Sequence, residues 1–338
     1  MSKPIMKTTV QTGNWVKNGV DVTRYTTVIA LIGVTILFSL ISPSFFTATN
    51  IANIFSQSAI LALVAIGLCF VVASGGIDLS VAVSFDLGAM TAIMALQAGM
   101  GWIPAILLGL LAGAIIGLFN GFFVVKLNIT PFLVTLATLF IGESVQKIFT
   151  KGGEPIFLTG MDEMYKFLGR GSALLIYTAD GGRIDFKFSI ILAVVLAAVA
   201  YFILTRTIFG RQLFALGSQK EASYLSGVPV KRYTVYAFVL SGVICAFAGM
   251  VGSSVLAAYT PLSGRYYLMD AIGAVFIGST LNRQGQANIS GTLIGVLFFG
   301  VLANGLNLVG INFYWQSVAR GLLIFLILGL NSYISQKS

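Results

Sequence analysis

Five ionisable residues stand inside long apolar stretches of this chain, where a charge is costly to bury. They are Asp78, Asp86, Glu143, Asp270 and Arg320. In hydrocarbon an unpartnered charge costs several kcal/mol, so each of these residues is by default a functional candidate. The chemistry open to them is ion or proton coupling, or hydrogen bonding to a polar solute. The structural alternative is that Arg320 neutralises one of the acids.

Three asparagines share this apolar setting, namely Asn120, Asn304 and Asn307. A side-chain amide in hydrocarbon needs hydrogen-bond partners, so these residues either join neighbouring helices or line a polar pathway. Together with the acids they predict a route for a small polar solute. The candidate pathway residues are Asp78, Ser80, Asn120, Asp270, Asn304 and Asn307.

The composition argues against several classes of chemistry. The chain has no histidine, which removes histidine relays, histidine-ligated zinc sites and catalytic triads. Cys69 and Cys245 lie in apolar runs without ligand partners and are interpreted as core residues. No G-x-x-x-x-G-K-[ST] loop occurs, so any ATP that drives the protein binds another subunit. We therefore expect no catalytic residue, no metal site and no cofactor on this chain.

Hydrophobic residues make up 57% and charged residues 9% of the 338 positions, against about 25% charged in globular proteins. This composition predicts an integral membrane protein. The net charge of +9 comes without a dense basic patch and follows topology, so we expect no nucleic-acid partner.

The apolar stretches predict an all-α fold with about ten transmembrane helices. The expected spans are residues 25–41, 51–73, 78–97, 102–125, 131–149, 188–204, 233–256, 269–281, 291–308 and 313–330. Lysine and arginine predominate on the face that carries both termini, which predicts that both ends are cytoplasmic. We expect one transmembrane domain over residues 25–331 between cytoplasmic tails at 1–24 and 332–338. Residues 150–187 form a long outer segment, and residues 206–232 form a basic inner segment.

Two patterns predict how these helices are arranged. Gly109, Gly113, Gly117 and Gly121 recur at four-residue spacing and predict a helix-packing face. Displacing the chain by 184 positions aligns rare intramembrane residues with one another, which suggests an inverted repeat. The aligned pairs are Asp86 with Asp270, Asn120 with Asn304, Gly121 with Gly305 and Asn128 with Asn312. Chance matching in a biased composition is the alternative.

The inner segment at 206–232 contains signals for a short helix. Ser218 stands three residues before Glu221, the spacing of a capping box, and predicts a helix over residues 219–225. Gly227 favours its end and Pro229 prevents its continuation. The segment is therefore either a rigid surface for a partner or an ordinary basic loop.

The stretch GRQLFALGSQKEASYLSGVPVKRY resembles the cytoplasmic coupling segment of bacterial ATP-binding-cassette (ABC) sugar permeases, the ribose, galactose and arabinose type. Elsewhere in the chain, the turn SGGIDLS at residues 74–80 resembles the GGIDLS signature of the same family. Further similarity lies in SPSFFTATNIANIFSQSAI, GRYYLMDAIGAVFIGST and NGLNLVGINFYWQSVARGLLI. The resemblance implies that the segment docks on the ATPase through Gly210, Arg211, Ala215, Gly217, Glu221, Ala222, Ser226 and Gly227.

The resemblance implies the ABC importer permease fold in the bacterial inner membrane. It also implies a second permease subunit, identical or different, with the pathway between the two. A cytoplasmic ATPase would bind ATP and Mg²⁺, and a periplasmic or lipid-tethered binding protein would deliver the sugar. The sequence departs from the family at Asp86 and in LNRQGQANIS, residues 281–290. The intramembrane acids leave a second hypothesis open, an ion- or proton-coupled secondary transporter.

Overall fold

The computed structural model describes residues 22–177, 183–282 and 284–335, and this part of the chain is mostly helical. The expected N-terminal tail lies outside the described residues up to residue 21, as do Arg283 and residues 336–338. The helices are α1 (Val22–Ile41), α2 (Ala48–Ala73), α3 (Val81–Gln97), α4 (Trp102–Lys126), α5 (Pro131–Phe149), α6 (Glu163–Arg170), α7 (Phe188–Arg206), α8 (Ile208–Ser218), α9 (Lys220–Leu225), α10 (Val230–Leu256), α11 (Gly264–Ser279), α12 (Ile289–Leu308) and α13 (Phe313–Ser335).

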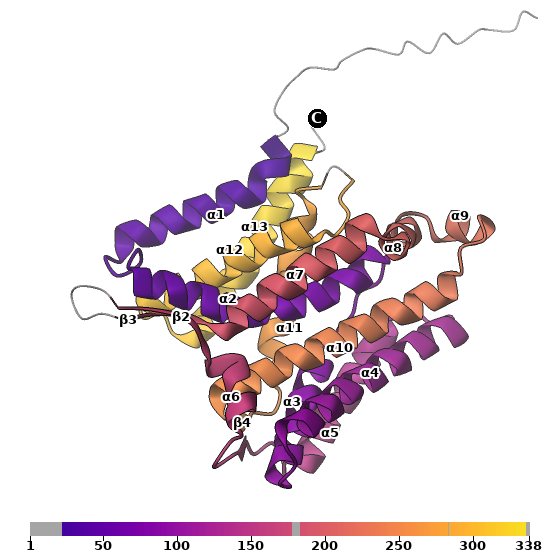
Figure 1. Ribbon diagram of the computed structural model, residues 1–338. Coiled ribbons are helices and arrows are strands. Elements are labelled where there is room, and N and C mark those ends of the chain that lie inside the picture. The colour runs from indigo at the N-terminus through magenta and orange to yellow at the C-terminus, as the bar shows by residue number, and fades with distance from the viewer. Residues whose placement is uncertain (1–21, 178–182, 283, 336–338) are drawn as a thin grey trace, which may run out of the picture.

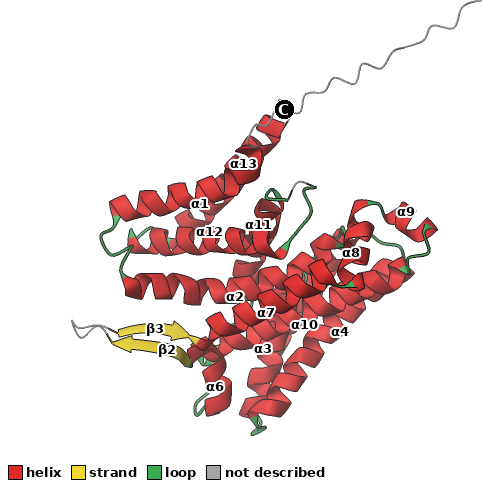
Figure 2. Ribbon diagram, turned by 45° about the horizontal axis from the view of Figure 1, so that its top comes forward, coloured by secondary structure: helices red, strands yellow, loops and turns green. Residues whose placement is uncertain are grey.

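Two small antiparallel sheets complete the described structure. β1 (Ile156–Phe157) pairs with β4 (Ala258–Tyr259), and β2 (Ser172–Tyr177) pairs with β3 (Arg183–Lys187). Figures 1 and 2 show the β2–β3 hairpin and α6 at one end of the helical bundle, called here the hairpin end. α8 and α9 lie at the opposite end, called the α9 end.

Every predicted span is found as a helix, but not every helix is long enough to cross a bilayer. Within the described residues, α2, α4, α5, α7, α10 and α12 have the length and apolarity of a membrane span. Tyr25–Ile41 in α1 and Val81–Gln97 in α3 are apolar but shorter. α11 has 16 residues, whereas a bilayer crossing takes about 20. α3 and α11 each follow a non-helical stretch, at residues 74–80 and 257–263.

α2 and α10 form the centre of the bundle and run in opposite directions. The thiol of Cys245 on α10 lies against the carbonyl of Val64 on α2, at 3.7 Å. α3 and α4 pack against α10, while α11 and α12 pack against α2 (Figure 1). Most residues of α4, α5 and α7 are not buried within the chain, and their large exposed side chains are largely apolar. Such faces suit contact with lipid tails.

All four glycines of α4 lie against α10, and Gly109 also meets α3. A Cβ on Gly121 would stand 2.9 Å from the Cα of Val235. A Cβ on Gly117 would stand 2.6 Å from the Cα of Val239, closer than real Cβ atoms approach. The absence of side chains at these positions therefore allows the two helix backbones into contact.

Candidate functional site

Asp78 lies at the centre of a buried hydrogen-bond network in the middle of the bundle. One carboxylate oxygen accepts the Ser80 amide at 2.9 Å and the Ser80 hydroxyl at 2.6 Å. The other oxygen accepts the Ser241 hydroxyl of α10 at 3.0 Å. Asn120 of α4 donates to the Ser80 hydroxyl at 2.7 Å and accepts from Thr138 of α5 at 2.6 Å. The network thus joins the α2–α3 turn to three helices.

The polar groups of this network are buried, so a solute has no access to them within one subunit. Asp78 and Ser80 are each 2% exposed, and Asn120 is fully buried. Their hydrogen bonds are made inside the protein, so in this conformation they hold helices together and offer no free group to a solute. Their assignment to the pathway remains a prediction.

Asp86, whose role the sequence left open, bonds to the start of α11. Its carboxylate accepts the Gly264 amide at 2.9 Å and the Ser263 hydroxyl at 2.8 Å. A negative charge at a helix N-terminus is favourable, because the first amides of a helix lack partners within it. Nearby, Gln146 accepts the Tyr259 hydroxyl, also at 2.9 Å. The α10–α11 turn is therefore fixed by side chains of α3 and α5.

Asn304 pairs with Asn50 through two reciprocal amide bonds, both of 2.9 Å. Asn50 donates a further bond to the Phe45 carbonyl at 2.8 Å. Both asparagines are buried, so the pair links α12 to α2 as Asn120 links α4 to the α2–α3 turn. No local pattern marks Asn50 as the partner, because Asn50 precedes Asn304 by 254 positions.

The remaining two pathway candidates lie together near the hairpin end. Asp270 of α11 forms a 2.8 Å salt bridge with Arg320 of α13, as the charge-neutralising alternative anticipated. Asn307 accepts a 2.7 Å bond from Gln316. The carboxylate of Glu143 is held in a similar way by Arg265, with Arg265 Nη2 at 2.9 Å from its Oε2. Each of the four intramembrane acids therefore has a partner within the chain.

Asp270, Asn307 and Arg320 line a cavity of about 460 Å³, called here the polar cleft. Most of its lining comes from α2, α11 and α12, with Arg320 from α13 and single residues from α7 and α10, and it also includes Arg170 and Lys187 beside the hairpin. Volumes of this order are typical of sites for small molecules. A second cavity of about 290 Å³ adjoins it and shares Tyr266 and Tyr267 with it.

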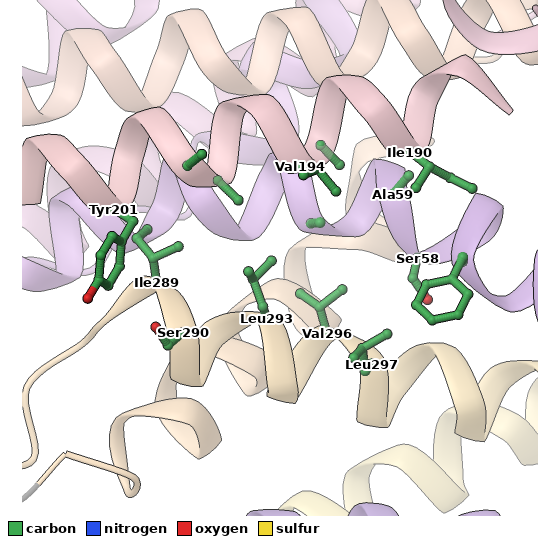
Figure 3. A pocket seen from close by; sticks show the side chains of 15 residues that line it. Ser58, Ala59, Ile190, Val194, Tyr201, Ile289, Ser290, Leu293, Val296 and Leu297 are labelled. Carbon is green, nitrogen blue, oxygen red and sulfur yellow. The ribbon is translucent and has the colours of Figure 1, made fainter. Parts of the chain in front are cut away.

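A groove of about 400 Å³ between α2, α7 and α12 has a different character. Figure 3 shows Val194 and Tyr201 of α7 facing Leu293 and Val296 of α12 across it. Its lining is almost entirely hydrocarbon, so a polar solute would lose bonds to water there without replacement. The polar cleft, in contrast, is lined by charged and amide side chains as well as apolar ones.

The basic inner segment forms two helices, where the sequence predicted one. Gly210, Arg211, Ala215 and Gly217 belong to α8, which directly follows α7. Gly217 lies against the α2–α3 turn, where a Cβ on Gly75 would stand 3.1 Å from the Cα of Gly217. One face of the segment is thus in direct contact with the turn that carries Asp78.

α9 carries Glu221 and Ala222, and Ser226 and Gly227 follow it directly. The expected capping box is wrong, because the Ser218 hydroxyl donates to the Phe214 carbonyl at 2.9 Å and α9 has no side-chain cap. Gly227 does adopt the left-handed conformation, with φ of 80°. The sequence interpretation missed the apolar tip of α9, where Tyr224 is 69% and Leu225 85% exposed. Two such neighbours on an isolated surface helix indicate a contact site.

The loop that departs from the family also contacts α8. Gln286 donates to the Ser218 hydroxyl at 2.8 Å. Gln284 and Gln286 line a small cavity of about 200 Å³ with Gly217 and Ser218. The loop between α11 and α12 is therefore part of the same surface as α8. Among the described residues, no group of three or more histidine, cysteine or acidic side chains is placed to hold a metal ion.

Comparison with known proteins places these features in a family. Residues 50–328 match the family described as branched-chain amino acid transport system / permease component. The chain belongs to this permease family. It is 35% identical over 291 residues to the ribose import permease protein RbsC of Bacillus subtilis (strain 168), covering 86% of this chain and 87% of that protein.

Two further relatives cover similar shares of the permease. It is 34% identical over 309 residues to the ribose import permease protein RbsC of Haemophilus influenzae, covering 91% and 93% of the two chains. It is 31% identical over 304 residues to the galactose/methyl galactoside import permease protein MglC of Escherichia coli (strain K12), covering 86% and 88%. The chain is thus a multi-pass membrane permease, a transport subunit and not an enzyme.

Proposed function

We propose that this permease is the membrane subunit of an ATP-driven ABC importer for a monosaccharide such as ribose or galactose. The observation that carries the proposal is similarity along most of the chain to import permeases for ribose and for galactose. A polar sugar does not cross about 30 Å of hydrocarbon unaided, so such a subunit must supply a polar route.

We propose that the α9 end faces the cytoplasm. Arg206, Arg211, Lys220, Lys231 and Arg232 cluster there, which the positive-inside rule favours. This orientation makes the hairpin end periplasmic and both termini cytoplasmic, with about ten membrane helices in one domain over residues 25–331. The tails at 1–24 and 332–338 are then cytoplasmic too.

The inverted repeat is supported by exchanged packing between two sets of helices. The first set is α2 to α5 and the second is α10 to α13. α4 packs on α10 of the other set, and α12 packs on α2. α3 and α11 are exchanged in the same way, α3 contacting α10 and α11 contacting α2. Antiparallel α2 and α10 at the centre match a repeat whose halves run in opposite directions.

The two ends of the bundle are assigned to two different partner proteins. A separate ATPase subunit binds ATP and Mg²⁺ and docks on α8 and α9, with Tyr224 and Leu225 as its apolar contact. A periplasmic or lipid-tethered binding protein delivers the sugar at the hairpin end, which includes residues 150–187. A second permease subunit, identical or different, completes the membrane unit within the surrounding lipid. This chain itself needs no cofactor.

The contact between Gly217 and Gly75 provides a mechanical route from the ATPase into the membrane. Movement of α8 acts directly on the α2–α3 turn, because their backbones touch. The turn carries Asp78, whose bonds reach α10 and, through Ser80 and Asn120, α4 and α5. A shift of α8 would therefore reposition helices on both sides of the subunit.

The competing hypothesis, a secondary transporter driven by an ion gradient, needs an acid that changes its protonation or ion during transport. Asp78, Asp86, Glu143 and Asp270 each already bond a serine, a backbone amide or an arginine. These contacts support structural roles for the acids and so favour the ATP-driven importer.

The deciding experiment is sugar uptake into proteoliposomes that contain the permease, its ATPase and its binding protein. Uptake of radiolabelled D-ribose or D-galactose should require all three proteins and ATP. Transport that persists without ATP or without the ATPase would overturn the proposal. Uptake by the permease alone that stops when the ion gradient is collapsed would support the secondary transporter instead.

A further inference from the structure

We propose that the groove of about 400 Å³ between α2, α7 and α12, called here the apolar groove, holds one acyl chain of an anionic phospholipid. The head group would lie among Tyr201, Ser290 and Arg206 at the α9 end. This inference goes beyond the proposed function, because it concerns a membrane lipid and not the transported sugar. The choice of the inner leaflet alone rests on the proposed orientation.

The body of the apolar groove is made of hydrocarbon from all three helices. Ala59 and Ala62 of α2 and Ala197 of α7 are buried, and their small side chains leave the space open. Val194 of α7 and Leu293 of α12 face each other across it (Figure 3). All three helices are long and apolar enough to cross a membrane. A lipid tail in this space gains dispersion contacts on several sides and gives up no hydrogen bond.

The length of the apolar groove matches the depth of one leaflet. On α7 its lining runs from Ile190 to Tyr201, which is about 16 Å at about 1.5 Å per residue. On α12 it runs from Ile289 to Leu297, about 12 Å by the same rise. Half of a hydrocarbon core of about 30 Å is about 15 Å. A membrane helix of a partner would need a groove along the whole core, so a single lipid tail fits this one better.

The two ends of the apolar groove differ in polarity. One end is formed by Ile190 and Leu297, whereas the hydroxyl groups of Tyr201 and Ser290 stand at the other (Figure 3). Neither of these two hydroxyls has a hydrogen-bond partner within the part of the chain that the structure describes. Ser290 lies in the first turn of α12, and the loop before it bonds α8 through Gln286. The polar end is therefore the α9 end.

A positive charge stands just beyond these hydroxyls. Arg206 ends α7 less than two turns after Tyr201, and its side chain is exposed. It forms no salt bridge with any described residue. Arg211 of α8 adds a second cation at this end. Basic groups beside a groove between membrane helices attract anionic head groups on the cytoplasmic side, and tyrosine is enriched at the same level. An apolar body with a polar, basic end thus has the pattern of one phospholipid.

The first test measures the phospholipid that stays bound to the permease after purification in mild detergent. Native mass spectrometry of the unmodified chain from membranes containing phosphatidylglycerol should show one tightly held phospholipid. Ala198→Phe should lose most of it, because Ala198 is exposed and lines the groove, so the ring fills the space without entering the core. Val199→Phe is the matched control, since Val199 is 49% exposed on the same helix but outside the groove. Equal retention by the two variants, or no phospholipid on the unmodified chain, would overturn the proposal.

The second test concerns the head group. When phosphatidylglycerol and phosphatidylcholine are offered in equal amounts, the unmodified permease should retain the anionic lipid preferentially. Arg206→Gln should reduce this preference about fivefold, as expected for one arginine beside an anionic surface. Lys126→Gln is the control, because Lys126 ends α4 and does not line the groove. An unchanged preference in the Arg206 variant, or an equal loss in both, would contradict the head-group position.

Thermal unfolding separates a lost lipid from a damaged fold. Added phosphatidylglycerol should raise the unfolding midpoint of the unmodified permease and of Val199→Phe, because a ligand that binds only the folded state stabilises it. Ala198→Phe should have a similar midpoint without added lipid and gain less from it. The same gain in all three proteins would count against the groove.

The other candidate occupant is a second copy of the permease. Ala198→Cys, oxidised in native membranes, should give no disulfide-linked dimer, and Cys69 and Cys245 are buried and do not interfere. A covalent dimer would assign the groove to a second copy and overturn the lipid. None of these measurements requires sugar import, so their failure leaves the proposed function intact. Failure of the reconstituted complex to import either sugar would overturn the proposed function alone.

Discussion

Gly217 of α8 and Gly75 of the α2–α3 turn lie in backbone contact, so close that a Cβ on Gly75 would stand 3.1 Å from the Cα of Gly217. Gly75 has a φ of 83°, a backbone conformation that residues with a side chain rarely adopt. The two glycines join the basic segment outside the bundle to the turn that leads to Asp78. Two motifs that lie far apart in the chain thereby form one unit.

A side chain at position 217 is expected to disturb this unit. In Gly217→Ala the new methyl group would collide with the Ala73 carbonyl, so α8 must move away from the turn. We expect uptake by the reconstituted complex to fall several-fold while the ATPase still co-purifies. Gly33→Ala is the control, because a Cβ at that position meets no atom within 4 Å. Similar uptake by both variants would show that the contact carries no movement.

Reversing the charge of Glu221 is expected to weaken ATPase docking. Glu221 lies in the first turn of α9, where a negative side chain favours the helix by about 0.5 kcal/mol, and it is exposed beside Tyr224. Glu221→Lys should reduce co-purification of the ATPase and leave membrane insertion unchanged. Glu163→Lys makes the same reversal in the first turn of α6 at the other end. If the Glu221 variant co-purifies and transports normally, the docking surface lies elsewhere.

The Asp78 network predicts a loss of stability when one donor is removed. Ser241→Ala takes away the donor to one oxygen of a buried carboxylate, which should cost about 1–3 kcal/mol. Thermal unfolding of the purified permease in detergent measures this as a lower midpoint. Ser144→Ala is the comparison, because its exposed hydroxyl bonds only the Phe140 carbonyl of its own helix. Equal midpoints for the two variants would mean that Asp78 does not depend on Ser241.

Apolar length predicted where the helices lie, because a stretch of hydrocarbon side chains has few alternatives to a helix in a bilayer. It could not tell full spans from short helices after a turn, as α3 and α11 demonstrate. Polar residues inside spans were recognisable as exceptional, but their partners were not. Ser241 bonds Asp78 across 163 positions, and no local pattern marks such a pair.

The basic segment illustrates why local signals can mislead. The spacing of Ser218 and Glu221 satisfies a capping pattern, yet Ser218 ends α8 and bonds backward to Phe214. A serine hydroxyl can satisfy either a following amide or a carbonyl four residues before it. Only the position of α8 against Gly75 and Gln286 decides between them. The candidate site residues were thus recognisable by type, whereas their roles depend on packing.

The proposed docking of the ATPase requires that α8 and α9 lie on the cytoplasmic side of the membrane. Leu225→Cys at the tip of α9 and Leu174→Cys on β2 place exposed thiols at the two ends of the bundle, since the unsubstituted side chains are 85% and 54% exposed. In intact cells a membrane-impermeant maleimide should label the Leu174 variant, and should label the Leu225 variant only after the membrane is opened.

The two thiols serve as controls for each other, because both replace an exposed leucine and differ only in the end that carries them. The ATPase works with cytoplasmic ATP, so a docking helix on the far side of the membrane could not be reached by it. Labelling of the Leu225 variant in intact cells would therefore remove α8 and α9 from the mechanism. The ATPase could then not move α8, and the contact between Gly217 and Gly75 would transmit no movement from it.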